Sequence, residues 1–213
     1  MKTVWCAEIA SKAYIDTVRT VKTGGFQDSE GAELVSAMAG GSNARLIVEA
    51  WTLGSDVATS IGLAIASRHT GGRHVCVVPD EQSRLEYEDA TSQAGVSPEF
   101  VVGEAEEAME GLPGVDFVVI DCRRRDLARV LRFAKMSSKG AVLVCKNASP
   151  KAVPGFRWRG MLGSGTRAVR STFLPVGNGM EIAQLGTGGG LGNKSRWINH
   201  IDRNTGEVHV FLR

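Results

Sequence analysis

Short, uninterrupted apolar runs separated by longer mixed stretches are the feature that most restricts how this chain can fold. One run, 117–120, leads into Asp121, and another, 141–145, leads into Lys146-Asn147. Apolar runs of this length are typical of parallel strands buried on both faces. Ligands of open α/β sheets bind at the carboxyl ends of such strands, so we expect Asp121, Lys146 and Asn147 to lie at one crevice.

Expected strands and helices alternate along the chain. The expected helices cover 6–22, 29–39, 55–68, 81–94, 104–110 and 125–136, and the expected strands cover 45–49, 74–78, 99–102, 115–120 and 141–145. Strand and helix thus follow each other five times, which predicts a Rossmann-like α/β fold with a doubly wound, mostly parallel sheet. Two further strand-like runs, 168–176 and 180–185, are joined by Gly177-Asn178-Gly179, which predicts a terminal antiparallel hairpin.

We interpret the 213 residues as a single domain with a short extension. The domain covers 1–186, with an N-terminal helix in 1–27 and the core in 28–186. The extension, 187–213, is expected to pack on the domain and to hold a last strand near 208–212. Its glycine cluster favours a linker over an anion-binding loop, because it lacks the spacing of a phosphate-binding motif.

Composition limits the cellular compartments and the kinds of partner that we expect. No apolar run approaches the roughly 20 residues that span a bilayer, and the N-terminus does not resemble a secretory signal. The four cysteines are widely spaced and form no zinc motif. We therefore expect a protein of the cytoplasm, with the nucleus left open, and no membrane partner.

Charge is distributed unevenly along the chain. Residues 1–111 hold 8 Lys and Arg against 17 Asp and Glu, whereas 112–213 hold 17 Lys and Arg against 6 Asp and Glu. Such asymmetry either steers anionic ligands or partners to one side of the protein, or both charged surfaces are simply solvated.

The layout resembles class I S-adenosylmethionine-dependent methyltransferases, in particular the cation-dependent O-methyltransferases that act on catechols and caffeoyl-coenzyme A. The similar segments are 28–34 (DSEGAEL), 46–66, 115–121, 141–147 and 174–180 (LPVGNGM). A closer resemblance, carried by 10–18 (ASKAYIDTV), 68–75 (RHTGGRHV) and 173–177 (FLPVG), is to a plant family catalogued as domain of unknown function 1442. That family implies the methyltransferase-like fold without an established activity.

The resemblance implies S-adenosylmethionine as cofactor. The first strand of these enzymes leads into a turn of the form E-x-G-x-x-x-G, which passes close to the methionine part of the cofactor. Glu49 matches the acid, Gly54 with Ser55 matches the later glycine after a one-residue deletion, and Trp51 replaces the first glycine. Trp51 is therefore either a core or lid residue or part of a rebuilt ligand pocket.

Later turns supply the remaining cofactor contacts. The family's ribose-binding acid aligns with Val78, and Asp80 follows two residues later. Asp80 either reaches the ribose or only favours a helix N-terminus. Gly103-Glu104-Ala105 resembles the turn near the adenine, and Asp121 is a further candidate cofactor-binding residue.

The metal site departs from the family pattern. The relatives bind Mg²⁺ through an Asp after the fourth strand and an Asp-Asn pair after the fifth, and Asp121 and Asn147 match two of these ligands. Lys146 replaces the third, and an ammonium repels Mg²⁺, so we predict no divalent metal. Lys146 either pairs with Asp121 structurally, or holds an anionic substrate oxygen or acts as a base. Asp121, Lys146 and Asn147 are the candidate catalytic residues.

Three functions remain open at this stage. The first is an S-adenosylmethionine-binding, metal-independent methyltransferase-like protein of weak or no activity, with an unidentified small-molecule acceptor. The second is a noncatalytic binding or regulatory protein for an anionic ligand or a protein. The third is nucleic-acid binding through the basic C-terminal half, where Phe156 and Trp158 lie among basic residues. Those residues are Arg123, Arg124, Arg125, Arg129, Arg132, Lys151, Arg157, Arg159, Arg167 and Arg170. A homodimer is compatible with each.

Overall fold

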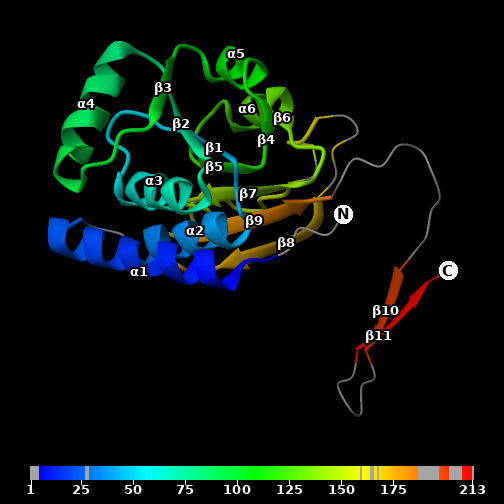
Figure 1. Cartoon of the computed structure of the whole chain (residues 1–213). Helices are drawn as coiled ribbons and strands as arrows, with labels where there is room; N and C mark the ends of the chain where they lie inside the picture. The colour runs from blue at the N-terminus through cyan, green and yellow to red at the C-terminus, as the bar shows by residue number, and fades with distance from the viewer. Residues whose placement is uncertain are drawn as a thin grey trace.

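The computed structural model describes residues 5–26, 29–158, 160–163, 166, 168–186, 197–201 and 208–212. Within these ranges one seven-stranded sheet forms the centre of the molecule (Figure 1). Its strands are β1 (Leu46–Ala50), β2 (Arg73–Val78), β3 (Glu99–Val102), β5 (Phe117–Asp121), β7 (Ala141–Lys146), β8 (Ala168–Leu174) and β9 (Met180–Leu185). The helices are α1 (Ala7–Gly24), α2 (Ser29–Gly41), α3 (Ala58–Thr70), α4 (Glu81–Thr91), α5 (Ala105–Glu110) and α6 (Leu127–Phe133).

The strand order is β3-β2-β1-β5-β7-β9-β8. Strands β1, β2, β3, β5 and β7 are parallel, and β9 runs antiparallel to both β7 and β8. The predicted doubly wound sheet with a terminal hairpin is confirmed. The order reverses between β1 and β5, which is the position where open α/β sheets bind ligands.

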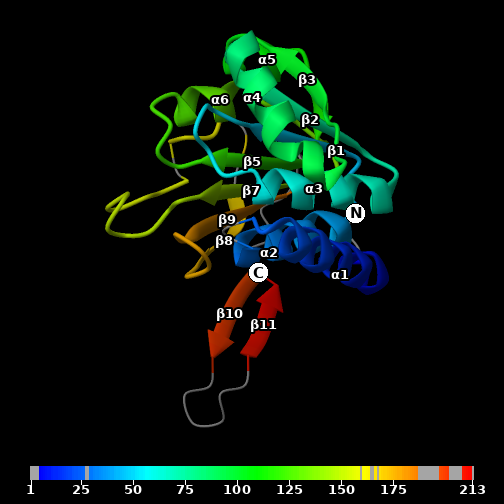
Figure 2. The ribbon, with the colours of Figure 1, turned by 90° about the vertical axis from the view of Figure 1, so that its left-hand side faces the viewer.

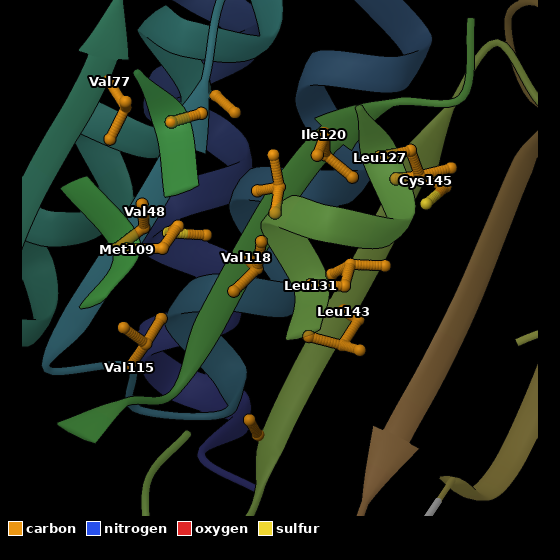
Figure 3. Close-up of a cluster of buried hydrophobic side chains, with 14 of the residues drawn as sticks. Val48, Val77, Met109, Val115, Val118, Ile120, Leu127, Leu131, Leu143 and Cys145 are labelled. Carbon is orange, nitrogen blue, oxygen red and sulfur yellow. The ribbon is translucent and has the colours of Figure 1, made fainter. Parts of the chain in front are cut away.

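Helices cover both faces of the sheet (Figures 1 and 2). On one face α2 and α3 pack on the sheet through a buried cluster that includes Val35, Leu63, Val119 and Val144, and α1 joins the cluster through Ala13. On the other face α5 and α6 contribute to the cluster drawn in Figure 3, which joins Val48, Val118 and Leu143 to Met109 and Leu131. Burial on both faces explains why the central strands are uninterrupted apolar runs.

Several helices and strands begin or end at other residues than predicted. The expected strand 115–120 divides into β4 (Pro113–Val115), which pairs with β6 (Lys135–Met136) in a small separate sheet, and β5. Asp116 separates them because its carboxylate accepts hydrogen bonds from the backbone N–H groups of Arg45 and Leu46. The expected helix 125–136 is shorter, since α6 ends at Phe133.

The C-terminal part holds two strands, β10 (Trp197–Ile201) and β11 (Val208–Leu212), which pair antiparallel. The strand expected at 208–212 is confirmed, whereas β10 had not been predicted. The glycine-rich run 187–196 lies outside the described residues, and the packing of the extension on the domain stays a prediction. In the described ranges, every helix is too short or too polar to cross a membrane.

Candidate functional site

Three predicted residues come together on one face at the carboxyl ends of neighbouring strands. Glu49 in β1 pairs with Val119 in β5, and Val119 pairs with Val144 in β7. Asp121 and Lys146 follow these valines by two residues, so their side chains project from the same face of the sheet as Glu49. The strand topology therefore delivers two carboxylates and one ammonium to one end of the sheet.

Glu49 is fully buried and surrounded by polar groups. Its Oε1 accepts a hydrogen bond of 2.9 Å from the Ser60 hydroxyl, and its Oε2 lies 3.5 Å from His74 Nε2. Burial opposes the charged form, but His74, the ammonium of Lys146 and Ser60 together outweigh it. The pKa of Glu49 is therefore lowered, and Glu49 is an ionised carboxylate within the core.

The turn after β1 begins with a buried tryptophan. Trp51 is 2% exposed, and its ring meets Tyr87 of α4 edge to face with ring centroids 5.4 Å apart. The backbone N–H of Trp51 donates to the Val77 carbonyl oxygen, which extends the pairing of β1 with β2 by one residue. Trp51 is thus a core residue, the first of the two interpretations left open by the sequence.

Beyond Trp51 the turn opens outward. Gly54 has a φ of +75°, and a Cβ built there would meet no atom within 4 Å. Its backbone N–H bonds to Glu86 Oε1 at 3.1 Å, and the hydroxyl groups of Thr52 and Ser55 lie 3.1 Å apart. Gly54 and Ser55 thus lie in a glycine turn with free space beside it.

The two later turns have different characters. Asp80 caps α4 by accepting a hydrogen bond of 2.7 Å from the Ser83 N–H, and this bond lowers the pKa of its exposed carboxyl group. Gly103, after β3, has a φ of +139° and again leaves a Cβ position free of neighbours. Glu104 is the N-cap of α5, and Ala105 is buried in its first turn.

Asp121 is occupied by its own neighbours. Arg123 donates to it from the backbone N–H at 2.8 Å and from Nη2 at 2.7 Å. Asn147, which has a positive φ of 59°, donates from Nδ2 to Oδ2 at 2.7 Å. Burial alone would raise the pKa of Asp121, but the hydrogen bonds from Arg123 and Asn147 lower it.

An ion pair of Lys146 with Asp121, one of the alternatives that the sequence left open, does not form among the described residues. In the described part of the chain Lys146 makes no ion pair within 4.0 Å, and its Nζ donates to the Asp56 carbonyl oxygen at 3.4 Å. Lys146 is 7% exposed, and its charge lowers the pKa of Glu49. The cation that pairs with Asp121 is instead Arg123, which lies two residues later in the chain.

The side chains present fit the cofactor better than the metal. Gly54 and Gly103 leave the backbone open at the ends of β1 and β3, and the Trp51 ring points into the core, so these turns can receive an extended ligand. Hard cations prefer free oxygen ligands. Here Asp121 accepts from Arg123 and Asn147, and an ammonium stands at the third ligand position, so this donor set does not fit Mg²⁺.

Sequence reasoning missed the partners of Glu49. Ser60, His74 and Tyr87 are buried near it, yet each lies in a stretch that reads as an ordinary strand or helix. The available signal was the alternation of β2, where His74, Cys76 and Val78 share a face. A histidine among residues buried on both faces requires a polar partner.

Comparisons with solved structures agree with this architecture. A methyltransferase from Geobacter sulfurreducens is 20% identical, with 81% of this chain and 88% of that chain covered and a TM-score of 0.58. The Bacillus cereus O-methyltransferase in complex with S-adenosylhomocysteine is 18% identical, with coverage of 80% and 90% and a TM-score of 0.56. TomG from Streptomyces achromogenes, an O-methyltransferase solved with S-adenosylmethionine, is 23% identical, with coverage of 82% and 90% and a TM-score of 0.55.

These similarities show that the fold is that of class I S-adenosylmethionine-dependent methyltransferases. No protein with a curated description matches the chain. One family model, described as a protein of unknown function (DUF1442), matches residues 1–213. The chain, which carries a methyltransferase fold, therefore belongs to the DUF1442 family.

Proposed function

We propose that this protein binds S-adenosylmethionine or S-adenosylhomocysteine without a divalent metal, and that its methyl-transfer activity is weak or absent. The observation that carries the proposal is the pair of open glycine turns after β1 and β3, at the carboxyl ends of the parallel strands, where open α/β sheets bind ligands. Similar structures bound to these molecules, such as the Bacillus cereus enzyme, support the choice of ligand.

Each turn has a distinct role in binding. Gly54 lets the backbone approach the methionine part, because no side chain fills the space beside it. The exposed carboxylate of Asp80 accepts hydrogen bonds from the ribose hydroxyl groups, because a carboxylate can accept two such bonds at once. The turn at Gly103 and Glu104 borders the adenine. When bound, S-adenosylmethionine supplies an activated methyl group.

The polar residues near the reacting end favour binding over catalysis. A general base needs an accessible atom and a pKa near the working pH. Asp121 has a lowered pKa and already accepts from Arg123 and Asn147. The charge of Lys146 is balanced by Glu49. The same observations support the alternative, a noncatalytic methyltransferase-like protein whose ligand regulates a partner.

Calorimetry with S-adenosylhomocysteine tests the binding. We expect the same Kd in EDTA and in Mg²⁺. The change Asp80→Asn should weaken binding about tenfold, because it removes a charged acceptor while keeping a good N-cap. Asp89→Asn, at the exposed far end of α4, is the matched control and should bind as the wild type does.

Two results would count against the proposal. Absence of heat at millimolar S-adenosylhomocysteine would contradict binding, and loss of binding in EDTA would contradict metal independence. Turnover of radiolabelled S-adenosylmethionine with catechol and carboxylate acceptors then separates the two candidate functions. A rate indistinguishable from the protein-free control favours the noncatalytic protein.

A further inference from the structure

The two edges of the seven-stranded sheet differ in how they are protected. One edge is β3, which has four residues, follows Pro98 and begins at Glu99, whose carboxylate pairs with Arg73. The other edge is β8, which has seven residues, no proline and no acid (Figures 1 and 2). Short length, proline and charge are means by which proteins keep an edge strand from pairing with another chain. β3 has these features, whereas β8 has a single charge, on Arg170.

The side chains of β8 are open to solvent on both faces of the sheet. All residues from 169 to 173 are exposed, with Val169 at 73% and Phe173 at 37%, whereas the neighbouring β9 is mostly buried. β8 pairs with β9 along one side only, so the backbone groups of its other side have no strand partner in the described part of the chain. A long, exposed and partly apolar edge of this kind favours pairing with a further strand.

The described residues of the same chain do not supply that strand. β10 and β11 pair with each other in a sheet of their own, and Figures 1 and 2 show this hairpin clear of β8. β8 is instead suited to pairing with a second copy of itself. Its pairing with β9 is irregular between Ala168 and Arg170, which leaves 170–174 as the regular part of the strand, centred on Thr172. A twofold axis at Thr172 makes two such strands antiparallel, as the closed symmetry of a homodimer requires.

An antiparallel arrangement about Thr172 brings compatible side chains together. Thr172 then lies opposite its own copy, Ser171 lies opposite Phe173 of the second copy, and Arg170 lies opposite Leu174. Cross-strand threonine pairs are favourable, whereas like charges directly opposite each other are destabilising. The only charge of β8 thus avoids its own copy, because the two arginines lie at opposite ends of the paired segment.

We propose that two copies of this protein associate through β8, with residues 170–174 of each copy paired antiparallel about Thr172. The pairing joins the two sheets into one continuous sheet and covers the exposed edge of both copies. β8 is separated from β1 and β3, whose turns form the proposed cofactor site, by several strands of the sheet. The association is therefore independent of S-adenosylmethionine binding.

Sedimentation equilibrium of the full chain tests the proposal, and we expect a dimer. The changes Thr172→Lys and Thr172→Glu should each weaken the dimer about tenfold or more, because each places like charges directly opposite each other across the axis. An equimolar mixture of the two variants should associate at least as tightly as the wild type, since lysine then faces glutamate. Thr23→Lys, exposed near the end of α1, is the matched control and should leave the Kd unchanged.

Three results would overturn the pairing through β8. The first is a wild-type chain that stays a monomer at about 100 µM, as it does when its own C-terminal residues cover the edge. The second is a dimer that Thr172→Lys leaves intact, and the third is a pair of charge variants that stay monomeric when mixed. Thr172 is exposed, so both variants should fold. Hydrogen exchange is an independent measurement, because the amides of 170–174 in the wild type should exchange more slowly at higher protein concentration, and exchange that does not depend on concentration would contradict the proposal.

Discussion

Glu49 is an ionised carboxylate with no exposed surface, held among His74, Ser60 and Lys146. Removal of one member of a buried charged set leaves the others without compensation, which is more costly than replacement of the whole set by apolar groups. At this residue scale, Lys146 is better understood as the counter-charge of Glu49 than as a substitute for the metal ion of related enzymes.

The change Lys146→Met should lower the free energy of unfolding by about 3 kcal/mol, because the Glu49 carboxylate then stays buried without its nearby cation. The double variant Glu49→Gln/Lys146→Met should lose less than the sum of the two single changes. Urea unfolding at pH 7 measures both, with the exposed Lys139→Met as the matched control. Additive losses, or a neutral Lys146→Met, would show that the two charges are not coupled.

The ionised carboxylate of Asp121 stabilises the folded state, and this contribution is lost in acid. Arg123 and Asn147 lower its pKa in the folded state despite burial. The contribution is therefore complete above the unfolded pKa, near 3.8, and disappears as the pH falls through the lower folded value. We expect Asp121→Asn to reduce the loss of stability between about pH 5 and pH 2 by about 1 kcal/mol. Urea titrations at several pH values test this, with Asp89→Asn as control, and parallel pH curves for Asp121→Asn and the wild type would contradict it.

At the scale of elements, α3 is the helix that fits most closely into its surroundings. It is buried from Ala58 to Ser67 because it lies between the sheet and α2. Gly62 makes this approach possible, since a Cβ at this position would lie 2.6 Å from the Ala32 carbonyl oxygen of α2. The small, apolar composition that predicted a closely packed helix is explained by this contact.

The change Gly62→Ala should therefore destabilise the protein by about 2 kcal/mol, although alanine is intrinsically the better helix former. Gly111→Ala, at the end of α5, is the control, because a Cβ there meets its nearest neighbour at an ordinary 3.4 Å. Thermal unfolding of both variants measures the difference. A Gly62→Ala variant as stable as the wild type would mean that α2 and α3 can separate at little cost.

At the scale of the whole molecule, several arginines of the basic half are paired with nearby acids. Arg123 pairs with Asp121, Arg124 with Asp126 and Arg129 with Glu106. Arg132 donates to the Gly160 carbonyl oxygen, whereas Arg159 and Arg167 lie outside the described residues. Pairing with acids of the same surface reduces the field that would attract a phosphate backbone.

Nucleic-acid binding should accordingly be weak. We expect a Kd of roughly 100 µM or weaker for a single-stranded RNA of about 20 nucleotides at physiological salt, as for nonspecific contacts. Fluorescence anisotropy over a range of salt concentrations measures it. Micromolar, strongly salt-dependent binding that Arg123→Glu/Arg124→Glu abolishes, while Arg170→Gln retains it, would favour the nucleic-acid function instead.

The sequence by itself determined the fold class and the residues at the strand ends. Alternation of apolar runs with helical stretches, and the Asn178-Gly179 turn, were sufficient for the sheet and its terminal hairpin. These signals depend only on the spacing of residue types along the sequence, so no tertiary contact is needed to detect them. The positions of Asp121 and Lys146 followed from the same spacing, because both directly terminate predicted strands.

Only the tertiary structure decided which polar groups meet. The partner of Lys146, the inward ring of Trp51 and the burial of His74 beside Glu49 depend on strand register and helix packing between distant segments. Hydrogen bonds and ion pairs form or break when atoms shift by about 1 Å. Sequence periodicity specifies only the face from which a side chain projects. Lys146 and Asp121 share a face, yet it is Arg123 that donates to the Asp121 carboxylate, and the order of the residues alone does not specify that contact.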